Sequence, residues 1–174
     1  MFVADEQTVV AVDAARWQRL AAAVLTTEGV RGHAELSILF IGRDDMAELN
    51  TQFMGVDGPT DVLAFPIDAA EVEVASLPTR SVAPDRAPAD PGDLPLLLGD
   101  VVVCPEVAAA QCASHAGTLD DELALLVVHG LLHVLGHDHA EADERERMRA
   151  RERELLEAHH WNGPAPAAFR QDQE

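Results

Sequence analysis

The sequence contains no lysine and no tyrosine, so all 12 of its basic residues are arginine. We interpret the missing lysine, together with the abundant alanine, as codon bias. The 12 bases are outnumbered by 31 acidic residues, which gives a formal net charge of -19. A basic nucleic-acid-binding domain would show the opposite balance, so any RNA or DNA function must depend on a local site.

Cysteines and long apolar runs are also scarce. Cys104 and Cys112 fit neither a Cys-x-x-Cys redox motif nor a zinc ribbon, so we expect two small core residues in a reducing compartment. No apolar run approaches the roughly 18 residues of a membrane-spanning helix. Residues 1–7 carry acids where a signal peptide has an apolar core. These absences favour a cytoplasmic protein without a membrane partner.

The composition is that of a globular protein. The 174 residues, 48% apolar and 25% charged, suggest that 1–174 form one domain. Between Asp68 and Pro95 the character changes, because five prolines stand among alanine, aspartate and serine. We predict a mobile loop at about 76–92. This stretch lacks apolar anchors, so a disordered insert is favoured over a functional loop.

Apolar spacing predicts where helices and strands lie. Strands are expected at 2–4, 34–41, 60–65 and 96–104, and helices after Asp13, after Asp44 or Asp45, and over about 106–116, 119–135 and 140–158. The helix over 119–135 is apolar nearly all round, which is typical of a buried central helix. Thr118 with Asp121 resembles a capping box at its start.

Histidines near the end of this helix carry the clearest chemical signal. His129 and His133 are four residues apart, so their rings project from one face and can share a metal ion. Gly136 can end the helix, after which His139 can return as a third ligand. Three imidazoles leave one tetrahedral position open for water, as in catalytic zinc sites. Two rings in an apolar helix need polar partners, which favours a shared metal over ordinary core histidines.

The sequence allows more than one third ligand and more than one metal. If the helix continued past Gly136, His137 would follow His133 by four residues and could bind in place of His139. The glycine favours His139. Asp138 is a candidate catalytic residue that orients a ligand histidine, or else a solvated turn aspartate. Three histidines suit zinc, and also copper, iron or nickel.

The histidine spacing matches the long zincin pattern, His-Glu-x-x-His-x-x-Gly-x-x-His, except at one position. Gly130 stands where zinc peptidases have the glutamate that acts as general base. Peptide hydrolysis would lack its proton acceptor, so a zinc peptidase is disfavoured.

The same segment, His129-Gly-Leu-Leu-His-Val-Leu-Gly-His-Asp-His139, resembles the His-Gly-x-Leu-His-Leu-x-Gly-Tyr-Asp-His signature of the YbeY endoribonucleases. Gly58–Pro66 resembles the Pro-Thr-Asp-Val-Leu-Ser-Phe-Pro segment of that family, and Leu98–Glu106 resembles its Gly-Asp-Ile strand. Met148 and Glu152 resemble its C-terminal helix. The resemblance covers roughly 36–156.

This resemblance implies an α+β fold, with a small mixed sheet, helices packed on it and a metzincin-like central helix carrying the metal ligands. It implies one zinc ion on His129, His133 and His139. The implied activity is a single-strand-specific endoribonuclease that matures the 3′ end of small-subunit ribosomal RNA and serves ribosome quality control. The implied partners are single-stranded RNA or rRNA, the small ribosomal subunit with its proteins, and the GTPase Era, and no DNA partner is expected.

A second function remains open, a non-enzymatic ribosome-assembly factor with a structural zinc. The acidic charge suits binding to a basic ribosomal protein better than binding to naked RNA. Met54 also departs from the family, which usually has an arginine there that is assigned to the RNA phosphate.

The last expected helix alternates arginines with acids: Arg145, Arg147, Arg149, Arg151 and Arg153. Pairs such as Glu141–Arg145 and Asp143–Arg147 stand at i, i+4, so we predict a solvated, self-paired helix rather than an RNA-binding surface. Asp61 and Asp100 lie at ends of expected strands. For both, capping of a turn is slightly favoured over a part in the site.

Overall fold

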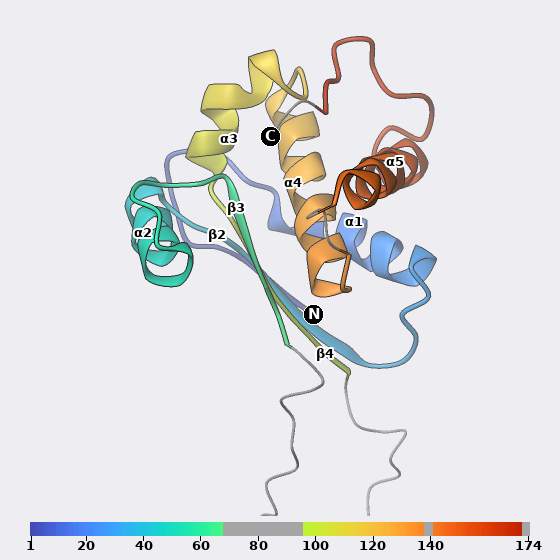
Figure 1. Cartoon of the computed structure of the whole chain (residues 1–174), viewed down its shortest axis with the longest axis horizontal. Coiled ribbons are helices and arrows are strands. Elements are labelled where there is room, and N and C mark those ends of the chain that lie inside the picture. Colours follow the sequence, from blue (N-terminus) through green and yellow to red (C-terminus); the bar gives the residue numbers. More distant parts are fainter. Residues whose placement is uncertain (68–95, 138–140, 172–174) are drawn as a thin grey trace, which may run out of the picture.

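A four-stranded sheet forms the centre of the computed structural model, which describes residues 1–67, 96–137 and 141–171 (Figure 1). The strands are β1 (Phe2–Asp5), β2 (Ala34–Phe40), β3 (Val62–Pro66) and β4 (Leu96–Val103), and their order is β1-β2-β4-β3. Strands β1, β2 and β4 run parallel, whereas β3 is antiparallel to β4, so the sheet is mixed. The loop predicted at 76–92 lies outside the described residues.

Five α-helices accompany the sheet within the described ranges: α1 (Ala14–Thr27), α2 (Arg43–Leu49), α3 (Pro105–Gln111), α4 (Leu119–Val134) and α5 (Ala142–His159). A π-helical turn, η1 (Asn50–Met54), continues α2, and a 3-10 turn, η3 (Cys112–Ser114), continues α3. Figure 1 shows α1, α4 and α5 over one face of the sheet and α2 on the other. The predicted small mixed sheet with packed helices is confirmed.

Two helix boundaries differ from the sequence prediction. Helix α2 begins at Arg43 rather than after an aspartate cap, because Gly42 is its N-cap and its carbonyl accepts from the Met46 amide at 3.0 Å. The helix expected over 106–116 remains α-helical only to Gln111 and then tightens into η3. That tightening turns the chain toward the start of α4.

Alternation along the strands produces two apolar layers. Val101 and Val103 of β4 join the main core with α1, α4 and α5, whereas Val102 packs with Met46 of α2 on the opposite face. Cys104 is buried in this second layer, as predicted, and burial raises the pKa of its thiol. Cys112 is only partly buried. No helix within the described ranges is both long and apolar enough to cross a membrane.

The two ends of α4 are fixed by local hydrogen bonds. At its start the Thr118 hydroxyl accepts from the Asp121 amide at 3.1 Å. At its end Gly136 has a φ of 90°, its amide donates to the His133 carbonyl, and the His137 amide donates to the Leu132 carbonyl. This left-handed ending stops the helix immediately after the histidine pair, as predicted.

Candidate functional site

His129 and His133 lie side by side on α4. Their Nε2 atoms are 3.1 Å apart, and the two rings meet edge to face at 76°. Two nitrogen ligands on one tetrahedral zinc ion, each about 2.0–2.1 Å from the metal, would be about 3.3–3.4 Å apart. The observed separation therefore fits two imidazoles that face a shared ion.

Glu152 of α5 contacts the other ring nitrogen of His129. Its Oε1 lies 2.7 Å from His129 Nδ1, and its Oε2 accepts from the Gln171 side chain at 2.9 Å. Because the carboxylate accepts the Nδ1 proton, the lone pair of a neutral imidazole is on Nε2, the atom that faces His133. A carboxylate placed in this way fixes the tautomer and orientation of a metal-binding histidine.

The sequence prediction missed this role of Glu152. A signal was available, because Glu152 shares the buried face of α5 with Met148, Leu155 and Leu156. An acid among buried apolar positions requires a polar partner. Nothing in the sequence pattern pointed to Gln171, which reaches Glu152 from the chain after α5.

The predicted third ligand, His139, and the predicted catalytic residue Asp138 lie outside the described residues. Within 1–67, 96–137 and 141–171, no three His, Cys, Asp or Glu residues are grouped to hold a metal ion. His137 is directed at α1, with its Nε2 3.6 Å from Oε2 of Glu28. Because α4 ends before Gly136, the helical arrangement that would have brought His137 beside His133 does not form.

Gly130 packs directly against the sheet. A β-carbon built at this position would overlap Cγ1 of Val101 on β4. The position that carries glutamate in zinc peptidases therefore has no room for a side chain in this fold. This gives a steric reason for the departure from the zincin pattern.

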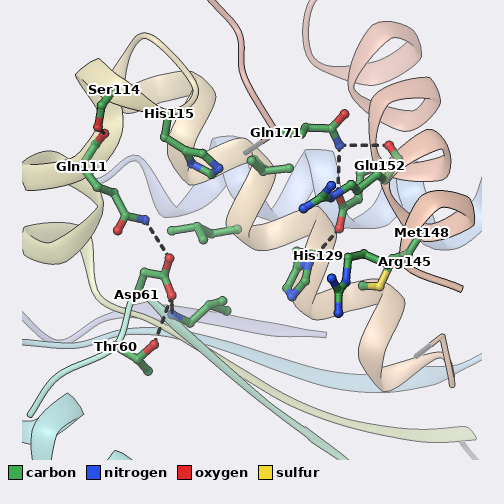
Figure 2. A pocket seen from close by; sticks show the side chains of 14 residues that line it. Thr60, Asp61, Gln111, Ser114, His115, His129, Arg145, Met148, Glu152 and Gln171 are labelled. Carbon is green, nitrogen blue, oxygen red and sulfur yellow. Dashed lines mark hydrogen bonds and ion pairs between the residues drawn. The ribbon is translucent and has the colours of Figure 1, made fainter. Parts of the chain in front are cut away.

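A pocket of about 560 Å³ lies over His129 (Figure 2). Helix α4 provides its floor. One wall carries Asp61 just before β3, Gln111 at the end of α3 and His115 just after η3, whereas α5 contributes Arg145 and Arg149 to the other wall. His129 is thus reached from a cavity that has hydrogen-bonding groups on one side and two arginines on the other.

A buried carboxylate organises the first wall. Glu122 of α4 is fully buried and accepts from Nδ1 of His115 at 2.8 Å, from the Ala116 amide at 3.1 Å and from Gln111 at 2.8 Å. Gln111 also donates to Asp61 at 2.7 Å. These hydrogen bonds fix the positions of the His115 and Gln111 side chains in the pocket wall.

The sequence left open whether Asp61 caps a turn or belongs to the site, and the structure shows it in both positions. Its Oδ1 accepts from the Val62 amide at 2.8 Å, so it caps the start of β3, and its side chain also lines the pocket. Asp100 lies exposed in the middle of β4, opposite Phe65, so the prediction that it lies at a strand end and caps a turn was wrong.

The prediction for the arginines of α5 is confirmed for two of them. Arg151 bonds Glu28 and Glu154 at 2.8 and 2.7 Å, and Arg153 bonds Glu157 at 3.0 Å. The predicted pairs Glu141–Arg145 and Asp143–Arg147 are absent from the ion pairs within 4.0 Å in the described part of the chain. The prediction was wrong for these pairs.

The family model and the similar curated proteins all point to one family. The family model for the endoribonuclease YbeY matches residues 2–160. A relative of that name from Salinispora tropica is 50% identical over 128 residues, covering 74% of this chain and 76% of the relative. Another, from Beutenbergia cavernae, is 45% identical over 152 residues, covering 87% and 92%. A third, from Mycolicibacterium vanbaalenii, is 45% identical over 141 residues, covering 81% and 69%.

The fold is also found in a solved structure. The solution structure of a Thermotoga maritima protein matches with a TM-score of 0.53 and 21% identity, over 93% of both chains. At that identity the likeness concerns the fold alone. The family model spans nearly the whole sequence, and the curated relatives share its name; the chain therefore belongs to the YbeY endoribonuclease family.

Proposed function

We propose that the chain is a zinc-dependent endoribonuclease that cleaves single-stranded RNA in the pocket over His129. The observation that carries the proposal is the facing pair of Nε2 atoms on His129 and His133, 3.1 Å apart beside a polar pocket. Membership of a family named for endoribonuclease activity supports RNA as the substrate. A pocket of about 560 Å³ is within the range that holds small organic ligands, and so has room for a nucleotide.

The donor set of the proposed site suits zinc. His129 and His133 would supply two imidazole nitrogens, and His139 is the proposed third ligand, on a metzincin-like helix and turn. Asp138 is proposed to orient His139. When bound, zinc supplies a Lewis acid that polarises a phosphoryl oxygen and lowers the pKa of water to about 7.

The chain's own residues would prepare this site before RNA arrives. Glu152 holds the proton on Nδ1 of His129, and Gln171 holds the carboxylate in turn. On the opposite wall, Gln111 and His115 are both anchored to Glu122. Groups already fixed in place lose less conformational entropy when a substrate binds, so this arrangement favours accurate positioning of the phosphodiester.

The proposed biological substrate is ribosomal RNA, at the 3′ end of the small-subunit rRNA, with a further part in ribosome quality control in the cytoplasm. The net charge of -19 opposes binding to a bare polyanion. That charge favours a substrate presented on the small ribosomal subunit, where basic proteins offer a complementary surface. The proposed partners are this subunit, its proteins and the GTPase Era.

Metal-free protein incubated with a single-stranded RNA oligonucleotide tests the proposal. We expect no cleavage until one equivalent of zinc is added, and no recovery in His133→Ala. His33→Ala, which removes an exposed histidine far from α4 in sequence, is the matched control and should cleave like the parent. The same sequence as duplex RNA or as DNA should remain intact.

The products report the nucleophile. Attack by water forms a new P–O bond, breaks the bond to the 3′ oxygen and leaves a 5′-phosphate, whereas attack by the RNA 2′-hydroxyl leaves a 2′,3′-cyclic phosphate. Tight zinc binding with no cleavage of any RNA, together with co-sedimentation with small ribosomal subunits, would overturn the nuclease and favour an assembly factor. Hydrolysis of casein would indicate a peptidase instead.

A further inference from the structure

Arg145 and Arg149 are the cations on the α5 wall of the pocket. They are four residues apart, and Met148 and Glu152, which also line the pocket, lie on the same side of the helix. In Figure 2 the Arg145 side chain lies beside His129. Arg145 is exposed and Arg149 half-buried, so both can be reached from solvent.

Two other arginines of the same helix are already paired, unlike Arg145 and Arg149. Arg151 and Arg153, on the same helix, form ion pairs with glutamates. In the part of the chain that the structure describes, no carboxylate lies within 4.0 Å of the Arg145 or Arg149 guanidinium.

The carboxylates that line or underlie the pocket already have hydrogen-bond partners. Asp61 accepts from Gln111, Glu122 from His115, and Glu152 is engaged by His129 and Gln171. None of these described carboxylates is within 4.0 Å of either guanidinium, so the guanidinium N–H groups are available to a ligand in the pocket.

A phosphate backbone is the ligand that this pair fits. A guanidinium presents a planar fork of donors that binds phosphate in a bidentate manner, and two forks one helical turn apart can engage neighbouring phosphates of one strand. In a chain of net charge -19, the long-range field repels RNA, so a local cationic pair is needed to hold it.

We propose that Arg145 and Arg149 bind consecutive phosphates of a single RNA strand and thereby set which phosphodiester lies over His129. This inference rests on the proposed function for the identity of the ligand. It assigns to α5 a specific binding role where the sequence pattern predicted only a solvated surface.

The test compares two double variants of equal charge. Arg145→Gln/Arg149→Gln removes the proposed pair, and Arg19→Gln/Arg147→Gln removes two exposed arginines outside this pocket. Binding of a fluorescent single-stranded RNA is measured with every protein carrying His133→Ala, so that no cleavage intervenes. Steady-state cleavage is then measured with the zinc-loaded chains that retain His133.

We expect the Arg145→Gln/Arg149→Gln protein to bind RNA at least tenfold more weakly. Its slope of log affinity against log salt should be shallower by about 1.4, since each phosphate contact on a single strand contributes about 0.7. KM should rise more than kcat falls, and cleavage positions should spread along the strand. Lysine at both positions should restore the salt slope but only part of the affinity, because the bidentate fork is lost.

Equal affinity and salt slope in the two double variants would overturn the inference, as would an absence of RNA binding by the parent chain. If the parent binds RNA and the pair matters for binding, but no chain cleaves, the inference stands and the proposed nuclease fails. If all chains cleave with the same KM, the nuclease stands and the inference fails. Unchanged thermal unfolding midpoints establish that the variants are folded.

Discussion

Nδ1 of His129 lies 2.7 Å from Oε1 of Glu152, so a buried carboxylate from α5 is aligned with an imidazole from α4. The contact joins residues 23 positions apart. It determines which nitrogen of His129 is available to a ligand, because the Nδ1 proton is already donated. The packing of α5 on α4 therefore also fixes the orientation of the His129 ring in the proposed site.

Substitution of Glu152 should weaken metal binding. Glu152→Ala is expected to lower zinc affinity by about 10–100-fold, since loss of the partner frees the ring to rotate and to change tautomer. Glu152→Gln should lower it less, because an amide oxygen can still accept from Nδ1. Competition with a chromophoric chelator measures the affinity.

Glu146→Ala is the matched control, since Glu146 is exposed on the same helix. It should bind zinc like the parent. Equal zinc affinity in Glu152→Ala and Glu146→Ala would show that the carboxylate has only a structural part at this helix contact.

Gly130→Ala should destabilise the fold through a clash between α4 and the sheet. The new methyl group would overlap Cγ1 of Val101, and overpacking of a well-packed core costs about 1–3 kcal/mol. Urea unfolding measures the loss. Val101→Ala removes the obstructing atom, so Gly130→Ala should cost less in a Val101→Ala background than in the parent. Additive losses in the double variant would contradict the proposed clash.

Much of the fold followed from apolar spacing. Helix α4 was predicted from its continuous apolar residues, with Thr118 at its start and Gly136 after its end, because a helix buried on all sides has a composition that surface helices lack. The start of α2 was missed because Gly42 caps it through its backbone alone, which leaves no side-chain signature. The family resemblance predicted a mixed sheet but not the order of its strands. Strand order depends on pairing between segments distant in sequence, which apolar spacing does not show.

The candidate site could be predicted only where its residues are close in sequence. His129 and His133 share one helical face, and their spacing alone predicted the facing pair. Glu152 and Gln171 join them through tertiary packing, which periodicity does not show. The pairing of Arg145 was predicted wrongly because i, i+4 spacing permits a salt bridge without requiring one, and an exposed pair contributes little free energy.

Removal of the Glu122 carboxylate should destabilise the protein strongly. Glu122→Ala would remove the fully buried acceptor of the His115 ring and the Ala116 backbone N–H, and one of the two acceptors of the Gln111 amide, at a cost on the order of 3 kcal/mol. The neighbouring variant Asp120→Ala breaks an exposed ion pair with Arg16 and should cost less than about 1 kcal/mol. Urea unfolding of both proteins compares the two, and similar losses would contradict the importance assigned to the buried network.

Asp121 should make the free energy of unfolding depend on pH. Burial acts to raise the pKa of this carboxyl, but hydrogen bonds from Thr118, Trp161 and His160 outweigh it and hold the pKa below its ordinary value. The unfolded chain then takes up the proton first as the pH falls. The contribution to stability is therefore complete above a pH of about 4, the unfolded pKa, and disappears as the pH falls through the lower folded pKa.

The variant Asp121→Asn isolates this contribution, because it retains the shape of the side chain but cannot ionise. It should be less stable than the parent at pH 7 by on the order of 1–3 kcal/mol, the cost of weakening hydrogen bonds to a charged acceptor. The difference in unfolding free energy between parent and variant should shrink as the pH is lowered below about 4. Urea unfolding at a series of pH values measures it. A difference that stays constant down to pH 2 would mean that Asp121 joins α4 to the end of α5 by hydrogen bonding alone, without a contribution from its charge.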